Sequence, residues 1–252
     1  MTREEILAAE TLYYCQPVYD CQTRRVSKGE LLLRARRPDG GFYPAQAFVQ
    51  AAEAQGLIHM LDLRALRHAC GALRRYRGTG VTQLGVNLSP VSCRMPGFAA
   101  RAEEVLRDFA DICGMLVIEV TETEPGEQDA QMQDTLARLR ACGALLAIDD
   151  FGKDYAGIAR MLDTPFDYLK LDKKIVERCE NDLFVRVVTE KLVDAMCLTS
   201  KSVVAEGVET GAQARRMQRM GVRYLQGYYY SPPIPEEDFI KQLRGERAPK
   251  AT

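Results

Sequence analysis

The sequence predicts an α/β protein in which short strands alternate with helices, as they do in a TIM-type (β/α)8 barrel. Two observations support this fold. Eight short apolar or β-branched runs follow one another along the 252 residues, and the segments between them carry helical spacing and helix caps. A doubly wound open sheet has the same alternation, so periodicity alone leaves both folds open. The expected strands are Leu12–Val18, Leu31–Leu33, Leu84–Leu88, Leu116–Val120, Leu145–Ile148, Tyr168–Leu171, Val203–Ala205 and Tyr224–Leu225.

The expected helices begin and end at residues that favour helix termini. Pro44 is suited to the start of one helix, and Gly56 follows that helix. Gly143 is placed to end the helix before the fifth run. Thr210 and Gln213 form a capping-box pattern, which predicts that a helix begins there. No Gly/Ser-rich or Pro-rich linker divides the chain, so we expect one domain over residues 1–243 and a polar tail over residues 244–252.

The composition argues against several classes of protein. A formal net charge of -1 gives no general attraction for DNA or for an anionic membrane. No stretch resembles a signal peptide or approaches the ~20 apolar residues of a membrane span, so we expect a soluble cytoplasmic protein. Eight cysteines without a C-x-x-C pair, and only two histidines, argue against a structural zinc site. The cysteines are expected to be small buried thiols in a reducing compartment.

Polar residues end or adjoin most of the apolar runs, and this pattern locates a site. The carboxyl ends of barrel strands meet on one face, which holds the active site in such proteins. Seven segments would bring five carboxylates, two amides and one lysine into a small volume. These residues are Glu30, Asn87, Glu119, Asp149, Asp150, Lys170, Glu206 and Gln226.

Carboxylates this close together repel one another and resist joint ionisation, and divalent cations relieve that repulsion. Oxygen ligands suit Mg²⁺ or Mn²⁺. The adjacent Asp149 and Asp150 could place one carboxylate between two ions and the other on the second ion. Two ions about 3.5–4 Å apart are a recurrent device for phosphodiester cleavage.

Each of these residues alone has a simpler interpretation. A carboxylate after a strand usually caps a helix or belongs to a turn, and the segment 149–152 by itself would indicate a turn closed by glycine. Lys170 and Asp172 lie on one side of a strand and could pair with each other. Glu124 and Glu127 are expected in a solvated acidic loop. The repetition of polar residues across many strand ends favours a shared site.

Ordered blocks of sequence resemble the EAL domain of cyclic di-GMP phosphodiesterases, from about Tyr13 to about Phe239. The signature segment reads Glu30-Leu31-Leu32, with leucine in place of the middle alanine, and Arg34 follows at the family's position. The other blocks are Tyr14–Pro17, Pro44–Glu53, Val86–Pro90, Ile118–Glu122, Asp149–Gly152, Tyr168–Asp172, Val204–Thr210 and Gln226–Tyr228.

The resemblance implies a role for each matching residue, and it implies hydrolysis of one phosphodiester of cyclic di-GMP to give linear pGpG. The implied ligands of two Mg²⁺ or Mn²⁺ ions are Glu30, Asn87, Glu119, Asp149, Asp150 and Glu206, with Asp149 between the ions. The implied catalytic residues are Glu206 as a base, Lys170 beside the attacking water, and Glu122 as the anchor of the loop after Asp150. The implied substrate-binding residues are Arg34, which contacts a phosphate, and Gln226, Glu209 and Asp172.

The chain departs from the family in the loop after Asp150. The family usually continues Thr-Gly-Tyr-Ser-Ser-Leu, and this chain reads Lys-Asp-Tyr-Ala-Gly-Ile over residues 153–158. Asp154 replaces a glycine, and Ala156 and Gly157 replace serines that can hydrogen-bond the loop. We therefore expect normal substrate binding with slow hydrolysis. A receptor that binds cyclic di-GMP without hydrolysing it is the alternative, and a barrel metalloenzyme for another phosphoester is a third reading.

EAL domains commonly pair through this same loop and the helix that follows it, so the resemblance also implies a homodimer. Ile158, Met161 and Leu162 could supply part of such a surface. The same three residues could instead pack onto the barrel, and their spacing favours neither interpretation.

Overall fold

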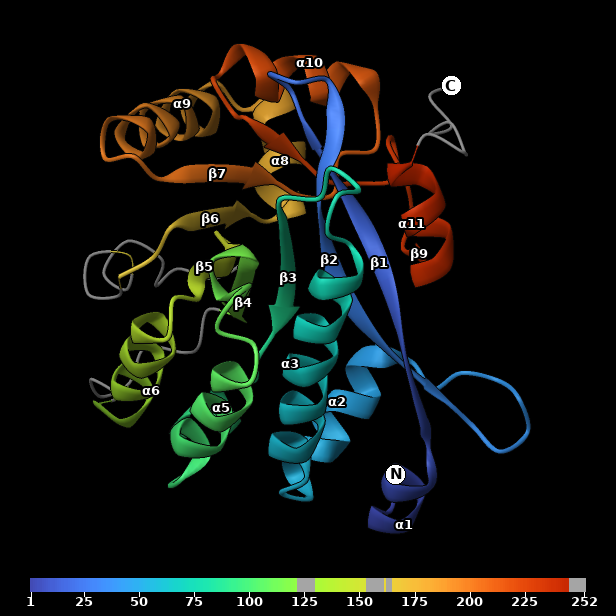
Figure 1. Cartoon of the computed structure of the whole chain (residues 1–252). Helices are drawn as coiled ribbons and strands as arrows, with labels where there is room; N and C mark the ends of the chain where they lie inside the picture. The colour runs from blue at the N-terminus through green and yellow to red at the C-terminus, as the bar shows by residue number, and fades with distance from the viewer. Residues whose placement is uncertain (122–129, 153–160, 162–164, 245–252) are drawn as a thin grey trace.

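The computed structural model describes residues 1–121, 130–152, 161 and 165–244. Eight strands close into one barrel in the order β2, β3, β4, β5, β6, β7, β8 and β1, and β1 pairs back with β2 (Figure 1). The barrel predicted from the sequence is confirmed, and this closure rules out the open sheet. The strands are β1 (Glu10–Asp20), β2 (Arg25–Arg36), β3 (Gln83–Asn87), β4 (Leu116–Thr121), β5 (Leu145–Phe151), β6 (Tyr168–Leu171), β7 (Ser202–Ala205) and β8 (Tyr224–Leu225), and a short β9 (Ile234–Pro235) also pairs with β1.

The first strand is the exception to the predicted alternation of strands and helices. β1 runs antiparallel to β2, and a turn over residues 21–24 joins the two strands with no helix between them. Arg24 has a φ of 56° in this turn, a left-handed conformation that helps to reverse the chain. From β2 to β8 all neighbouring strands are parallel. The strict alternation expected from the sequence is therefore wrong for β1 and holds from β2 onward.

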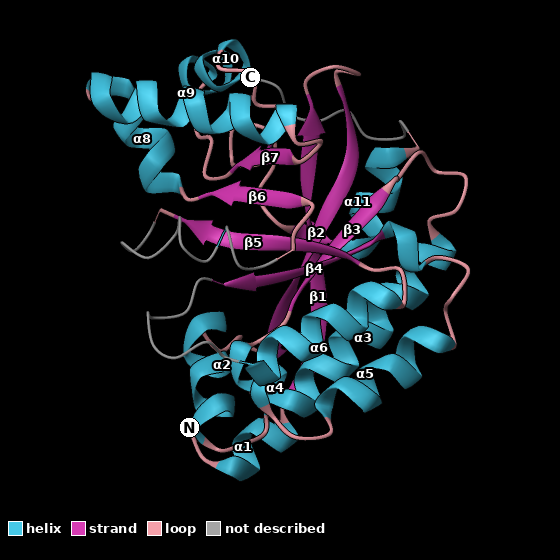
Figure 2. Cartoon of the chain, turned by 90° about the vertical axis from the view of Figure 1, so that its left-hand side faces the viewer, coloured by secondary structure: helices cyan, strands magenta, loops and turns pink. Residues whose placement is uncertain are grey.

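Helices cover the outside of the barrel (Figure 2). The expected caps are present: Pro44 precedes α2, Gly143 follows α6 with a φ of 97°, and Thr210 and Gln213 form a capping box on α10. The helices are α1 (Arg3–Ala8), α2 (Ala45–Ala54), α3 (Ile58–Arg75), α4 (Pro90–Arg94), α5 (Phe98–Arg107), the 3-10 turn η1 (Cys113–Met115), α6 (Ala130–Ala141), α8 (Lys173–Asn181), α9 (Leu183–Leu198), α10 (Gly211–Arg219) and α11 (Glu236–Leu243).

Three further expectations concern the chain as a whole. Among the described helices, none is both long enough and apolar enough to cross a membrane. Five of the eight cysteines are buried as expected, whereas Cys197 is exposed. The last helix ends at Leu243, and residues 245–252 lie outside the described ranges. The division into a domain over residues 1–243 and a tail over residues 244–252 stays a prediction.

The inside of the barrel is partly polar because strand side chains alternate between two faces. On β4, Leu116, Ile118 and Val120 join the main hydrophobic core, which lies between the barrel wall and the helices. Val117 and Glu119 of the same strand line a small cavity inside the barrel. The alternation that buries the apolar residues under the helices therefore directs the intervening residues into the barrel.

Lys28 of β2 lies in this interior, at the amino end of the parallel strands. Its ammonium is 3.8 Å from the ring centroid of Tyr224 and 4.2 Å from that of Tyr168. It donates hydrogen bonds to the Tyr168 hydroxyl, at 2.7 Å, and to the Gln83 side chain. Burial lowers the pKa of Lys28 to about 7. Lys28 therefore binds its proton less tightly in the folded protein than in the unfolded chain.

Replacing Lys28 by methionine should change how stability depends on pH. Between about pH 7 and pH 10.5 the folded lysine is neutral while the unfolded lysine is protonated, so the stability of the wild type should rise with pH. The rise relative to Lys28→Met should be on the order of a few kcal/mol, because each pKa unit corresponds to about 1.4 kcal/mol. Tyr168 still donates to Gln83 in the variant, so no buried partner is left without a hydrogen bond.

Chemical denaturation at several pH values measures this difference. Lys191→Met, which removes an exposed lysine on α9, is the matched control and should show the pH dependence of the wild type. Parallel stability curves for Lys28→Met and the wild type would contradict the assignment.

Candidate active site

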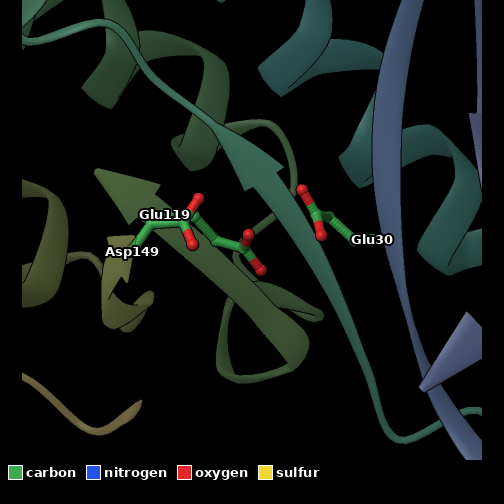
Figure 3. A group of neighbouring side chains, drawn as sticks. All are labelled: Glu30, Glu119 and Asp149. Carbon is green, nitrogen blue, oxygen red and sulfur yellow. The ribbon is translucent and has the colours of Figure 1, made fainter. Parts of the chain in front are cut away.

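An acidic site lies at the carboxyl ends of strands β2 to β8, an end that we call the barrel mouth. Glu30 comes from β2, Glu119 from β4 and Asp149 from β5, and their carboxylates converge from both sides of β3 (Figure 3). One oxygen of each carboxylate lies within 4.8 Å of the other two. The register of the parallel strands places Asn87 of β3 level with Glu119 of β4, because these two residues are paired.

Gly85 on β3 provides the space that Glu119 occupies. A Cβ atom at this position would overlap the Glu119 carboxylate, so a side chain there would displace it. A glycine within a strand often marks a close approach of this kind. This role of Gly85 was not predicted from the sequence, although a glycine inside an apolar run was a signal for it.

A second acidic group shares Asp149 with the first. Asp149, Asp150 and Glu206 also offer oxygens that lie within 4.8 Å of one another. Successive residues of a regular strand point to opposite faces, yet these two aspartates serve one site. The irregular pairing of β5 with β6 and the φ of 57° at Asp150 account for this, because they turn the chain at the end of the strand.

The ammonium of Lys170 lies among the carboxylates. It is 2.8 Å from Glu206, 3.1 Å from Asp149 and 3.2 Å from Glu30, and it also donates a hydrogen bond to Glu119. Only 3% of the Lys170 side chain is exposed. The alternative pairing of this lysine with Asp172 is not observed among the described ion pairs.

Burial and charge together shift the pKa values in this cluster. Burial raises the pKa of Glu119 well above its usual value and also raises that of Asp149, against the opposing effect of Lys170. Burial likewise raises the pKa of Glu206 to about 8. At Glu30, burial opposes ionisation, but Lys170 and hydrogen bonds from two amides lower the pKa overall. The four carboxylates hold the Lys170 pKa well above its usual value despite burial.

The cluster fits divalent cations. Five carboxylates and one ammonium leave four negative charges when all are ionised, which is the charge that two divalent ions neutralise. Every ligand is an oxygen, as Mg²⁺ and Mn²⁺ prefer. Asn87 and Gln226 each donate a 2.7 Å hydrogen bond to Glu30 and so orient its carboxylate. The side-chain oxygen of Gln226 is buried without a hydrogen-bond partner, which leaves an acceptor available at the site.

The remaining expected site residues lie around this cluster or outside the described ranges. Arg34 packs over the Tyr14 ring at 5.3 Å and lines a neighbouring cavity. Glu209 is paired with Lys173 at 2.5 Å. Asp172 caps α8 by accepting a hydrogen bond from a backbone amide. Glu122, like the loop over residues 153–158, lies outside the described residues, so its expected role stays a prediction.

A cavity of about 300 Å³ adjoins the acidic cluster. Arg34, Asn87, Asp62 and Glu53 are among the residues that line it. Burial raises the pKa of Asp62 to about 7, and its carboxylate accepts a hydrogen bond from the Ser89 backbone at 3.0 Å. Asp62 was not predicted as a site residue. The signal for it was a carboxylate on the face of α3 that is buried.

The fold and the site together define a barrel protein with a cluster of carboxylates at the barrel mouth that could hold metal ions. The chain belongs to the EAL family, because the family model described as the EAL domain matches residues 1–233.

Two curated relatives come from Escherichia coli strain K12. The chain is 33% identical to a probable cyclic di-GMP phosphodiesterase, PdeN, over 93% of this chain and 46% of the relative. It is 30% identical to the cyclic di-GMP phosphodiesterase PdeL, over 91% of this chain and 64% of the relative. The chain thus spans roughly half to two-thirds of the length of these two relatives. Among solved structures, it resembles the PaMucR phosphodiesterase in complex with c-di-GMP, with 27% identity, a TM-score of 0.81, and coverage of 91% of this chain and 94% of that one.

Binding of a divalent ion should release protons. Burial holds the pKa of Glu206 at about 8, so Glu206 retains a proton at neutral pH until an ion displaces it, and burial shifts the pKa of Glu119 in the same direction. The affinity for Mn²⁺ should therefore rise with pH up to about 8, by as much as roughly tenfold per pH unit for each proton displaced. Calorimetry in two buffers of different ionisation enthalpy measures the protons released. In Glu206→Gln the pH dependence should flatten, and an affinity independent of pH in the wild type would contradict the site.

Proposed function

We propose that this chain hydrolyses cyclic di-GMP to linear pGpG with two divalent ions, Mg²⁺ or Mn²⁺. The observation that carries the proposal is that Asp149 belongs to both acidic groups, as a ligand between two ions must. The identity of the substrate is supported by the names of PdeN and PdeL and by the ligand in the PaMucR complex. The two ions, when bound, supply an activated water and neutralise charge on the phosphoryl oxygens.

The residues of the site would have three roles, which are to hold the ions, to act as the base and to orient the water. One ion would be held by Glu30, Asn87, Glu119 and Asp149, and the other by Asp149, Asp150 and Glu206. Glu206 is also proposed as the base, because it belongs to the second acidic group and lies 2.8 Å from the Lys170 ammonium. Lys170, fixed by four carboxylates, would orient the water beside the phosphate.

The neighbouring cavity supports the choice of a cyclic dinucleotide. Its volume of about 300 Å³ can accommodate one purine base, and the cavity opens beside Asn87 and Glu30's strand. Arg34 lines this cavity, where its planar guanidinium can form two hydrogen bonds to a phosphate. Gln226, Glu209 and Asp172 are proposed to contact the substrate on the other sides of the cluster.

A receptor that binds cyclic di-GMP without hydrolysis is the second candidate. The observation that favours it is the sequence of residues 153–158, where Asp154, Ala156 and Gly157 depart from the family. All six expected ion ligands are present among the described residues, and this favours the enzyme. A different phosphoester as substrate is a weaker third candidate, because the sequence blocks match the family along most of the chain.

The expected homodimer stays a prediction. Of the three residues named for its surface, the structure describes Met161, which packs against the main hydrophobic core. This packing supports the alternative interpretation for that residue. A different exposed apolar surface lies on α9, where Phe184 is 77% exposed and Leu198 is 86% exposed.

Asp149→Asn should lower hydrolysis of cyclic di-GMP by at least ~100-fold, because it removes the charge shared by the two ions. The fold should be retained, since asparagine has nearly the same shape and relieves repulsion among buried carboxylates. The measurement is the rate of pGpG formation in saturating Mg²⁺, followed by chromatography, together with the affinity for cyclic di-GMP in Ca²⁺.

Asp194→Asn, which changes an exposed carboxylate on α9, is the matched control and should hydrolyse at the wild-type rate. Equal rates of pGpG formation by Asp149→Asn and the wild type would contradict the two-ion mechanism. A wild type that binds the nucleotide in Ca²⁺ but forms no pGpG in Mg²⁺ or Mn²⁺ would establish the receptor instead.

Restoring the family's loop residues should raise the rate. The triple variant Asp154→Gly, Ala156→Ser, Gly157→Ser regains a flexible glycine and two hydroxyls, and a ligand misplaced by about 1 Å can cost roughly a hundredfold in rate. We expect faster single-turnover hydrolysis in saturating Mg²⁺ and little change in the affinity measured in Ca²⁺. A triple variant that is no faster than the wild type would show that the loop does not limit the rate.

A further inference from the structure

We propose that the outside of the barrel holds a second ligand site, which takes a small planar molecule carrying an anionic group. The site is a cavity of about 270 Å³ between β1, α10, α11 and the segment 227–231. In Figure 1, α10 lies beside the end of the hairpin formed by β1 and β2. The residues that give the cavity its chemistry are Tyr19, Arg215, Gln218, Tyr229, Tyr230 and Gln242.

This cavity is separate from the barrel mouth. Tyr19 follows Val18, which lines the barrel interior, so the alternation of β1 directs Tyr19 outward. Tyr19 is paired with Val26 at the start of β2, upstream of Glu30 on that strand. None of the residues that line this cavity belongs to the acidic cluster or lines the cavity beside it.

Three tyrosines form an aromatic wall. The rings of Tyr19 and Tyr230 are stacked, with centroids 4.5 Å apart and an angle of 14° between their planes. Tyr229 meets Tyr230 edge to face, with centroids 5.0 Å apart. All three side chains are only partly buried. They therefore offer ring surface on which a planar molecule can stack.

Arg215 gives the cavity its charge. It is the one charged residue among the described residues that line the cavity, and no described carboxylate forms an ion pair with it. Its neighbours differ, because Arg216 pairs with Glu180 at 3.3 Å and Arg223 pairs with Asp20 at 2.9 Å. A guanidinium beside an aromatic wall and without a carboxylate favours an anionic ligand.

Gly211 lets two hydrogen-bond donors meet at one point of the cavity. A Cβ atom there would lie 3.1 Å from the Tyr229 hydroxyl oxygen and 3.2 Å from a terminal nitrogen of Arg215. The hydroxyl and the guanidinium therefore both lie against the Gly211 backbone. Gln218 and Gln242 add amide groups that can donate to or accept from the edge of a ring.

The shared chemistry of the ligand is a flat ring that bears a carboxylate or a phosphate. Two sources fit: a purine nucleoside monophosphate and an aromatic carboxylate. Both place a ring on the tyrosines and an anion on Arg215. The volume suits the ring of such a ligand, and its anionic substituent would reach the exposed Arg215.

The wall of this cavity is linked to the barrel mouth. The Gly227 carbonyl accepts hydrogen bonds from the Tyr230 and Ser231 amides, each at 3.0 Å. Gln16 donates to the Ser231 carbonyl at 3.2 Å and accepts from Gln226 at 3.1 Å. A ligand that changes the position of the Tyr230 ring therefore acts on the turn that follows Gln226.

Binding of two probes to the whole, ion-free protein tests the proposal. The probes are guanosine 5′-monophosphate and 2-naphthoate, and guanosine is the neutral comparison. At least one anion should bind saturably, and its affinity should fall roughly tenfold or more in Arg215→Ala, because the variant loses the charge-assisted hydrogen bonds to the anion. Arg219→Ala, on the same helix but outside the cavity, and Arg34→Ala, at the barrel mouth, should bind the anion as the wild type does.

Backbone amide chemical shifts show where the probe binds. We expect the largest shifts over residues 227–231 and at Gly211, and guanosine should bind more weakly than its monophosphate. The probe that binds identifies the source as nucleotide or aromatic acid.

The proposal is overturned if neither anion binds at ~10 mM, a concentration far above that of a useful effector. It is also overturned if Arg215→Ala binds as well as the wild type, or if Arg34→Ala alone abolishes binding and the shifts gather around Asn87. These outcomes do not depend on hydrolysis, so failure of the enzyme proposal would leave this test intact.

Discussion

The Lys170 ammonium lies among the carboxylates of Glu30, Glu119, Asp149 and Glu206, and the arrangement of the barrel mouth depends on this contact. Buried carboxylates at such distances repel one another unless a positive charge compensates them. One ammonium cannot balance all of them, and burial raises the pKa of Glu119, Asp149 and Glu206 despite its presence. A divalent ion at this site would therefore compete with protons for the same oxygens, and the lysine would be a fixed charge beside it.

Much of this arrangement could be predicted from the sequence, because strand alternation links burial to chemistry. An apolar run that stops at Glu119 or Asp149 must bury its apolar face under helices, and this directs the polar residue into the barrel. The hairpin of β1 and β2 was not predicted. Only twelve residues separate Val18 from Leu31, which is the lower limit for a helical crossover and was a signal for an antiparallel turn.

What the sequence could not supply was the distance between residues on different strands. Gly85 matters because β3 passes beside the Glu119 side chain, and Asp62 matters because α3 turns it into a cavity. Lys28 precedes its apolar run, so it resembles an ordinary solvated lysine until the barrel closes around it. Each of these roles depends on register and closure, which local patterns do not encode. The roles of Glu122 and of residues 153–158 stay predictions from resemblance.

The space above Gly85 has a consequence for how long the protein survives in a cell. Barrels usually fill such a layer with branched apolar side chains, whereas this chain fills it with the Glu119 carboxylate. An ion bound there would stabilise the folded state by mass action, by about 2.7 kcal/mol when the ion is a hundredfold above its Kd. Proteases act on the small unfolded fraction. Depletion of such an ion would therefore reduce the amount of the protein, which would tie its abundance to the supply of divalent cations.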